Sequence, residues 1–313
     1  MNRVEKNINS KTLRLKVFGS TGRLDSYVAS QCTGLSRSLV AKLIEQGRVL
    51  LNGKTVKPGS RPKEGDVIEV ALPPPPISPL IPQNLPLDIV YEDNDVLVVN
   101  KPPGMVVYPA AGHPDSTLLN AVIHHCPDLA FTESSLRPGV VHRLDKDTSG
   151  LMVLAKSKSA RENLVGQFKA RTVTKEYLVL VKGRLSPREG IIEAPLGRHP
   201  SQRQRIAVVK SGREAHTRYR VKQYLGDFTL VEAAIETGRT HQIRVHMAAI
   251  GFPVVGDSVY GVRSPNLDRQ FLHAFRLGFR LPSSGEYREF TVGLPDDLER
   301  ALKAMSGDVY RRN

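Results

Sequence analysis

The sequence predicts an α+β fold that follows a small, separate N-terminal module. Segments with strand patterns outnumber those with helix patterns along the 313 residues, and the two kinds do not alternate strictly. The proline-rich stretch LPPPPISPLIPQNLP favours an extended connector, because repeated prolines fit neither a packed helix nor a central strand. We therefore expect a flexible N-terminus at 1–12, a small domain at 13–72, a linker at 73–86 and a large domain at 87–313.

The small domain is expected to contain two helices followed by short strands. Residues 23–31 suit one short helix, and Ser36 is placed to cap a second helix that stops at Gly47. RVLLNGKTV reads as a strand, an Asn-Gly turn and another strand, and PKEGDVIEV ends the module with a last strand. The arrangement resembles the αL RNA-binding motif of a small-subunit ribosomal protein.

The large domain opens with two strands in LDIVYEDNDVLVVNK, joined by a turn at Asp93-Asn94. SARENLVGQFKAR suits a helix, whereas TKEYLVLVKG and FTLVEAAIETG suit strands. The segment 198–221 reads as a strongly basic hairpin, and Thr240 is placed to cap a helix that Gly251 ends. We see no internal repeat.

The chain carries a formal charge of +14, with 45 Lys and Arg against 31 Asp and Glu. Such an excess favours a polyanionic partner, because basic surface attracts and holds phosphate backbones. The alternative is a protein that is basic for no specific reason. The two cysteines lie far apart in the sequence, which predicts no disulfide framework. The sequence shows no apolar leader and no apolar run long enough for a membrane span, so we expect a soluble cytoplasmic protein.

An unusual amount of chemistry lies in GVVHRLDKDTSGLMVLAK, from Gly139 to Lys156. Val140-Val141 and 151–155 read as short buried strands, and the junction between them holds charged and hydroxyl side chains closed by Gly150. Asp145 lies between cationic neighbours, which favour its ionised form, and an ionised carboxylate can act as a nucleophile or general base. The alternative is a loop salt bridge.

Two further residues are candidates for the same site. Arg244 would lie on a helix at the edge of an apolar stripe, where a buried arginine needs an anionic partner, and Asp145 is one candidate for it. Tyr177 shares the apolar side of its predicted strand with Val179 and Val181. It is therefore either a core tyrosine or an aromatic surface for a bound base.

Three rival motifs are less well supported. DKDTS loosely resembles the loop of aspartate-nucleophile phosphatases, but no acidic cluster for magnesium follows it. Asp145 and Asp147 could form a glycosidase pair, although such pairs normally come from separate elements. His124-His125-Cys126 resembles a metal site, but adjacent residues point in different directions.

HRLDKDTSGLMVLAK resembles the central motif of the RluA-type pseudouridine synthases. Further segments agree with that family in the same order: NKPPGMVVYPAAGHP, TKEYLVLVKG, APLGRHP and ETGRTHQIRVHMAAIGFPVVGDSVYG. Together with the N-terminal module, they resemble the RluC/RluD-like enzymes that act on large-subunit ribosomal RNA. One departure is Tyr108, where relatives often carry histidine.

The resemblance implies a pseudouridine synthase fold, a mainly antiparallel mixed sheet with flanking helices. It implies that Asp145 is the catalytic aspartate, that Arg244 pairs with it and that Tyr177 contacts the flipped base and helps the C5 proton to leave. Arg143 would enter the RNA helix in place of the target uridine. Attack of Asp145 on C1′, its addition to the base and removal of the C2′ proton all remain open.

We therefore expect an isomerase that converts uridine to pseudouridine in structured RNA, most plausibly large-subunit ribosomal RNA or its precursor particle. Because the reaction involves no redox change and no exogenous group, we expect no cofactor and no metal, and we expect a monomer. Two alternatives are an inactive RNA-binding assembly factor and a base-releasing N-glycosidase. Measuring the mass of the RNA distinguishes the N-glycosidase from the isomerase, since isomerisation leaves the mass unchanged.

Overall fold

The computed structural model of the protein describes residues 12–19, 22–32, 35–72, 80–110, 112–131, 137–202, 204–265 and 267–310. The chain forms two compact units, residues 1–78 and 79–313, and each is described by itself. Of the flexible segment expected at 1–12, only Thr12 is described, and it lies in a strand. Half of the linker expected at 73–86, residues 73–79, also lies outside the described part.

The first unit is a four-stranded antiparallel sheet with two helices against it, in the strand order β1-β4-β2-β3. Its elements are β1 (Thr12–Lys16), α1 (Leu24–Gln31), α2 (Arg37–Glu45), β2 (Val49–Leu51), β3 (Lys54–Thr55) and β4 (Val67–Ala71). Leu24 and Leu43 of the helices pack with Ile68 of the sheet in one apolar core. The sequence patterns predict every one of these elements except β1.

Local chemistry explains where the elements of the first unit begin and turn. Ser36 caps α2 as predicted, because its Oγ accepts a hydrogen bond from the Leu39 amide at 3.3 Å. Asn52 and Gly53 both have positive φ, which the tight turn between β2 and β3 requires. The buried Asp25 carboxylate pairs with Arg23 at 3.0 Å and with Arg37 at 3.2 Å, which fixes two of the basic side chains of this unit.

The second unit is built on a nine-stranded mixed sheet in the order β5-β6-β7-β14-β8-β13-β12-β9, with β15 beside β14. Only β7 and β14 run parallel among the described pairs, so the mainly antiparallel α+β fold is confirmed. The strands are β5 (Ile89–Glu92), β6 (Val96–Lys101), β7 (Ser149–Ala155), β8 (Thr174–Lys182), β9 (Glu189–Glu193), β12 (His216–Leu225), β13 (Phe228–Ile235), β14 (Leu272–Arg280) and β15 (Tyr287–Thr291). A separate hairpin joins β10 (Leu196–Arg198) to β11 (Ile206–Val208).

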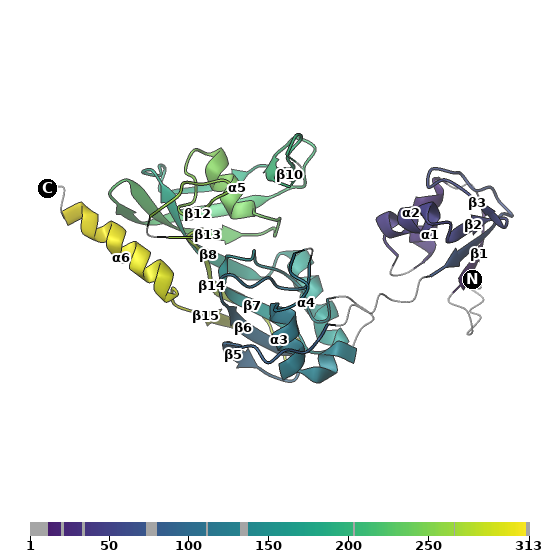
Figure 1. The fold of residues 1–313 in the computed structure, drawn as a ribbon, viewed down its shortest axis with the longest axis horizontal. Coiled ribbons are helices and arrows are strands. Elements are labelled where there is room, and N and C mark those ends of the chain that lie inside the picture. The colour runs from purple at the N-terminus through teal and green to yellow at the C-terminus, as the bar shows by residue number, and fades with distance from the viewer. Residues whose placement is uncertain are drawn as a thin grey trace. The chain divides into compact units, whose positions relative to one another are not determined.

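Helices flank both faces of this sheet. They are α3 (Leu118–His125), α4 (Lys158–Ala170), α5 (Gln242–Ala249) and α6 (Asp296–Tyr310), with a 3₁₀ turn at Pro127–Phe131. Strand β6 alternates between two cores, since Leu97 packs with α3 while Val98 packs with α4. In Figure 1, α3 and α4 lie at the β5–β7 half, and α5 lies with the β10–β11 hairpin at the β12–β13 half. None of the described helices is both long and apolar enough to cross a membrane.

Three local predictions need correction. Val140-Val141 is not a strand: Gly139 turns the chain with φ +70°, and only Val140 makes an isolated bridge, to Leu154. The basic hairpin is limited to β10 and β11, because Thr217, Tyr219 and Val221 alternate inward and bring β12 into the main sheet. Arg203 of that hairpin lies outside the described residues.

The third correction concerns the start of α5. Thr240 does not cap it; His241 occupies the N-cap position in the left-handed conformation and makes no side-chain cap. The Gln242 side chain instead closes the turn before the helix, where its Oε1 accepts from the Arg239 amide at 3.0 Å. This conformation directs His241 toward the pocket described next.

Candidate active site

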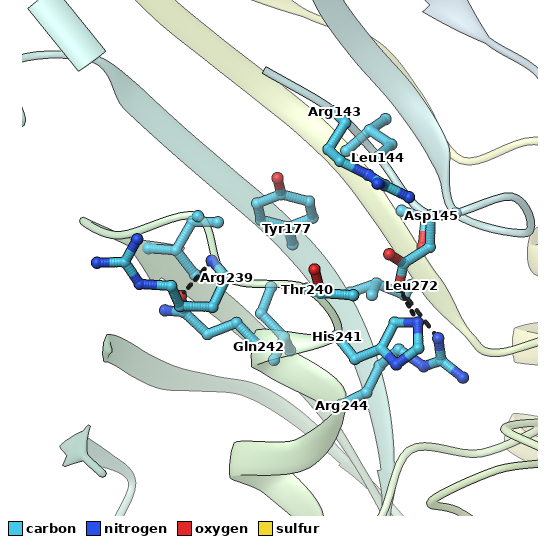
Figure 2. Close-up of a pocket in the computed structure, with 14 residues that line it drawn as sticks. Arg143, Leu144, Asp145, Tyr177, Arg239, Thr240, His241, Gln242, Arg244 and Leu272 are labelled. Atoms are coloured by element: carbon cyan, nitrogen blue, oxygen red, sulfur yellow. Dashed lines mark hydrogen bonds and ion pairs between the residues drawn. The ribbon is translucent and has the colours of Figure 1, made fainter. Parts of the chain in front are cut away.

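Asp145 lies on the loop that leads into β7, next to the central pair β7 and β14 of the sheet. Its side chain is 16% exposed, so it is partly protected from water but reachable from a pocket. Figure 2 shows its carboxylate facing His241 and Arg244, with Tyr177 on the strand behind. The pocket therefore brings together residues from four separate segments of the chain.

The backbone of the Asp145 loop is fixed by three consecutive carbonyl contacts. The Asp145 carbonyl accepts from the Thr148 amide at 3.1 Å. The Lys146 carbonyl accepts from Lys101 Nζ at 3.0 Å, and the Asp147 carbonyl accepts from Arg269 Nη1 at 3.0 Å. Because each carbonyl is held from a different direction, the Asp145 carboxylate is presented in one position before any substrate binds.

Lys101 is the most deeply buried of these anchors. It ends β6 with 0% exposure, and its ammonium also donates to the carbonyls of Pro102 and Met105. Burial lowers the pKa of Lys101 to about 7, although the nearby Asp147 and Asp145 carboxylates oppose the shift. A buried lysine is therefore used here to hold a turn and the Asp145 loop together.

Gly150 allows the two central strands to approach at the base of this loop. Its φ is +116°, and a Cβ at this position would lie 2.2 Å from the Ala274 carbonyl oxygen of β14. Only glycine fits both the conformation and the contact. The glycine that appeared to close the loop thus lies within β7 and sets how closely β14 approaches it.

Arg244 connects Asp145 to a second carboxylate. Its Nη1 donates to Asp145 Oδ2 at 3.0 Å, while Nε and Nη2 donate to the two oxygens of Asp257 at 2.7 and 2.9 Å. Burial alone would lower the pKa of Arg244, but the two carboxylates raise it above its usual range. The guanidinium is thus permanently charged and is held by Asp257 in a fork geometry.

Asp257 is itself fully buried and orients Arg244. Burial alone would raise the pKa of Asp257, but the hydrogen bonds and charge of Arg244 and two backbone amides keep it below its usual range. Those amides belong to Val259 and Tyr260, whose N–H groups donate to Oδ1 at 2.8 and 3.0 Å. Asp257 therefore links Arg244 to the turn that carries Tyr260.

His241 and Tyr260 extend this network to the β10–β11 hairpin. The Tyr260 hydroxyl accepts from the Ile206 amide at 2.8 Å and is hydrogen-bonded to His241 Nδ1 at 2.9 Å. The other ring nitrogen, His241 Nε2, lies 3.9 Å from Asp145 Oδ2. Burial lowers the pKa of His241 even though Asp145 favours its charged form.

Tyr177 lies on β8 and lines the same pocket as Asp145. It is 6% exposed, and it packs in the same core as Val179 and Val181, as the strand alternation predicts. Burial raises the pKa of Tyr177 well above its usual range, and the charge of Asp145 adds to this effect. The phenol is therefore protonated and offers a ring and a hydroxyl to the pocket.

Arg143 occupies the exposed rim of the pocket. Its Nη1 donates to the Tyr108 hydroxyl at 2.9 Å, and the Arg137 guanidinium lies 3.8 Å from the centre of the same ring. Tyr108, the one noted departure from the family pattern, thus holds an arginine that the resemblance assigns to RNA contact.

The four residues singled out from the sequence therefore line one pocket: Arg143, Asp145, Tyr177 and Arg244. The sequence reasoning missed Asp257, His241 and Tyr260 as parts of the site. The segment that contains Asp257 and Tyr260, VVGDSVYG, had only been matched to a family. A buried arginine with three donor nitrogens could have suggested a second carboxylate, because one carboxylate cannot satisfy all of them.

One group of potential metal ligands exists among the described residues, and it lies outside this pocket. Glu92, His125 and Cys126 come together there, without His124. The Lys156 ammonium lies 2.7 Å from Glu92 Oε1 and His125 Nε2 lies 2.8 Å from Oε2. Because a cation already neutralises the carboxylate, we assign no metal to this group.

The chain resembles known proteins along both units. Residues 95–249 match the family described as RNA pseudouridylate synthase, and residues 22–68 match the S4 domain. A relative from Bacillus subtilis, the uncharacterized RNA pseudouridine synthase YlyB, is 46% identical over 90% of this chain and 93% of its own length. The ribosomal large subunit pseudouridine synthase D of Xanthomonas campestris is 41% identical over 92% of this chain and 90% of its own.

Among solved structures, the human RNA pseudouridylate synthase domain containing 1 is similar with a TM-score of 0.55 and 30% identity. The match covers 71% of this chain and 96% of the human one. A fold of this kind therefore exists in a protein that lacks more than a quarter of the present chain.

Proposed function

Because the chain belongs to the RluA-type family of RNA pseudouridine synthases, we propose that it isomerises specific uridines of large-subunit ribosomal RNA and that Asp145 is its catalytic aspartate. The protein is an isomerase with an S4 RNA-binding domain. Relatives at 40–41% identity that are named ribosomal large subunit pseudouridine synthase D support the ribosomal substrate. A ribosomal substrate also places the enzyme in the cytoplasm, and nothing in the proposal needs more than one copy.

The observation that carries the assignment of Asp145 is its environment. It is the only carboxylate among the described residues that line the pocket, and it faces Arg244, His241 and Tyr177. The Arg244 guanidinium donates a hydrogen bond to the carboxylate and so orients it, which a nucleophile or base requires. Because Arg244 donates its other two hydrogen bonds to Asp257, the pairing with Asp257 holds its position when Asp145 is replaced.

The reaction needs the uridine outside its stack, since a duplex hides both C1′ and C5. Asp145 assists cleavage of the C1′–N1 bond, the uracil rotates in the pocket, and a new bond joins C5 to C1′. The hydrogen at C5 then leaves to solvent while N1 gains a proton, so no atoms are added to or lost from the RNA. We leave open whether Asp145 attacks C1′, adds to the base or removes the C2′ proton.

Tyr177 and Arg143 are proposed to hold the substrate. The ring of Tyr177 contacts the extruded base, and because its raised pKa keeps the phenol protonated, Tyr177 acts there by contact and hydrogen bonding. Arg143 leaves Tyr108 and stacks where the uridine was, which an exposed guanidinium at the rim can do.

The test uses large-subunit ribosomal RNA that carries tritium at C5 of uridine. Wild type is expected to release tritium into water, and Asp145→Ala and Asp145→Asn are expected to release none above background. Asparagine has the same shape, and Asp257 keeps Arg244 in place, so lost release from Asp145→Asn would reflect chemistry and not misfolding. Equal release by Asp145→Asn and wild type would refute the assignment of Asp145.

Two further outcomes would overturn the wider proposal. A loss of RNA mass equal to one uracil less the water that hydrolysis adds would indicate a glycosidase. Tight binding without tritium release, from naked RNA and from ribosomal subunits alike, would indicate a binding factor.

A further inference from the structure

A second cavity of about 660 Å³ adjoins the candidate active site. It lies between α4, the start of β8 and the segments 137–143 and 235–239. Five residues line both cavities: Arg143, Tyr177, Ile235, Gly238 and Arg239. Whatever occupies the second cavity therefore lies directly beside the group that Asp145 acts on.

Aromatic and aliphatic side chains line one side of this cavity, its floor. The rings of His142 and Phe168 stack with their centres 4.9 Å apart and an angle of 27° between them, beside Val140 and Val165. His142 Nε2 accepts from the Val153 amide at 3.0 Å, which requires an unprotonated nitrogen. Burial lowers the pKa of His142 to about 3, so this surface is uncharged at neutral pH.

The rim of the cavity is strongly cationic. Eight Lys and Arg side chains line it against one carboxylate, that of Glu236. Glu236 lies 3.5 Å from His216 Nδ1, outside the lining, and 4.0 Å from Arg171, which lines the cavity and also pairs with Glu214. Lys175 is 8% exposed, and its ammonium donates to the Glu236 carbonyl at 3.2 Å. The rim thus holds more positive charge than its own carboxylate neutralises.

We propose that this cavity binds the nucleotide next to the target uridine, with its base against the His142–Phe168 floor and its phosphates at the cationic rim. The inference rests on the proposed function, because it takes RNA to be the substrate. A lining that combines aromatic and aliphatic side chains with cations matches the two parts of a nucleotide, a planar base and an anionic phosphate. The volume lies within the range of cavities that enclose small molecules.

This binding mode would assist the reaction. Extruding one uridine breaks its stacking on both neighbours, and that loss opposes binding. A neighbouring base that stacks on His142 and Phe168 recovers part of the lost energy within the protein. The cavity would therefore lower the cost of extrusion at the position that Asp145 modifies.

The test measures coupling between a base and a side chain. The RNA is a fragment around a uridine mapped by the tritium assay, with an abasic ribose on its 5′ or 3′ side. Affinities are measured with Asp145→Asn, so that no turnover occurs, alone and combined with Phe168→Leu, which removes the ring but keeps an apolar side chain. The matched control is Phe228→Leu, a partly buried phenylalanine that does not line the cavity.

On one side of the target uridine, either 5′ or 3′, we expect the abasic ribose to weaken binding roughly tenfold relative to the intact RNA when Phe168 is present. With Phe168→Leu the same abasic ribose should weaken binding much less. With Phe228→Leu the tenfold loss should persist. Equal losses with and without the Phe168 ring, on both sides of the target, would overturn the proposal. In that event wild type would still release tritium. If the proposed function were wrong instead, wild type would release no tritium.

The rim is tested by a second pair of variants on α4. Lys169 lines the cavity, whereas Lys158 lies at the other end of the same helix, where it pairs with Glu162. Lys169→Gln is expected to weaken RNA binding and to reduce its salt dependence by about one phosphate contact, and Lys158→Gln is expected to change neither. Identical salt dependence of the two variants would contradict the role of the rim.

Discussion

At the residue scale, Asp257 decides where the buried arginine beside Asp145 can lie. It is fully buried, does not line the pocket and takes two of the hydrogen bonds of Arg244. The pair resembles an internal scaffold: Asp257 sets the position of the guanidinium, and the remaining nitrogen is left for Asp145. Because Asp257 holds the Arg244 guanidinium in place, Arg244 approaches Asp145 from one fixed direction.

The first prediction concerns this scaffold. Asp257→Asn should lower activity by at least a hundredfold, because Arg244 loses its fork and Asp145 loses an oriented partner. It should also destabilise the protein by about 3–5 kcal/mol, since a buried guanidinium keeps an incomplete set of partners. Tritium release and urea unfolding check the two effects. Glu232→Gln, which weakens the pairing with Arg220 and Lys222 outside the lining of the pocket, serves as a control. Full activity in Asp257→Asn would contradict the scaffold role.

His142 gives a prediction for pH dependence. Its pKa is about 3 in the folded protein, because of burial and the Lys175 charge, against about 6.5 in an unfolded chain. Between these values the unfolded state binds one more proton, so the free energy of unfolding falls as the pH falls through this window. His142→Gln keeps an acceptor for the Val153 amide but does not titrate. The loss of stability from pH 6 to pH 4 should therefore be smaller by roughly 2 kcal/mol in this variant.

Urea unfolding at a series of pH values measures this difference. If the stability curves of wild type and His142→Gln run parallel from pH 6 to pH 4, the imidazole is not kept neutral by its surroundings. A convergence of the two curves toward acid pH is the expected result.

At the element scale, the side chain of Tyr260 connects the β10–β11 hairpin to the candidate active site. The Tyr260 hydroxyl joins the Ile206 amide of β11 to His241, and the Tyr260 amide donates to Asp257. Arg205 reinforces the same tie, because its guanidinium donates to the Val259 carbonyl. The basic hairpin is thus held by the same turn that positions Asp257.

The prediction at this scale is that Tyr260→Phe loosens the hairpin and removes the partner of His241 Nδ1, while the Tyr260 amide still holds Asp257 and, through it, Arg244. The ring, which lies 5.3 Å from the Arg244 guanidinium and 5.2 Å from that of Arg205, is retained. The Ile206 amide loses its acceptor, which costs about 1–3 kcal/mol if the amide stays buried. We expect KM for RNA to rise about tenfold with little change in kcat, measured by tritium release. Tyr224→Phe, which removes a hydroxyl bonded to Leu185, should leave KM unchanged. The same KM in both variants would argue against the tie.

The elements also show what the sequence can and cannot predict. Strands such as β8 and the helix α4 follow directly from residue alternation and from capping by Ser157. The pairing of β7 with β14 joins residues more than a hundred positions apart, and the edge strand β9 pairs with β12 across the separate β10–β11 hairpin, so no local pattern encodes either contact. Strand β14 lacks a clear alternation because both of its faces are buried.

The same limit applies to the site. Asp145, Tyr177, Arg143 and Arg244 could be singled out because their segments are locally unusual or resemble a family. The roles of Asp257 and Tyr260 follow only from tertiary contacts, since their segment contains few charges and reads as a loop. The left-handed conformation of His241, which turns it toward Asp145, also had no visible signal.

At the scale of the whole molecule, the two units have separate cores. The apolar cluster of the first unit contains no residue beyond Leu72, and the clusters of the second unit begin at Leu80. All the described residues that line the pocket belong to the second unit. A solved structure that matches 71% of this chain over 96% of its own length shows that a similar fold exists without the full chain. We therefore predict that RNA binding by the S4 domain can be separated from the chemistry of the pocket.

A chain that begins at residue 79 is therefore expected to fold and to keep its chemistry. Its kcat should stay within about threefold of the full-length value, because Asp145 and its partners are all retained. Its KM for structured RNA should rise by an order of magnitude or more, and binding should depend less steeply on salt, since the phosphate contacts of the S4 domain are lost. Tritium release at several RNA and salt concentrations measures all three quantities, and thermal unfolding checks that the truncated chain is folded. A folded truncated chain with a greatly reduced kcat and an unchanged KM would show that the first unit completes the active site. That result would refute the assignment of RNA binding to the first unit and of the chemistry to the second.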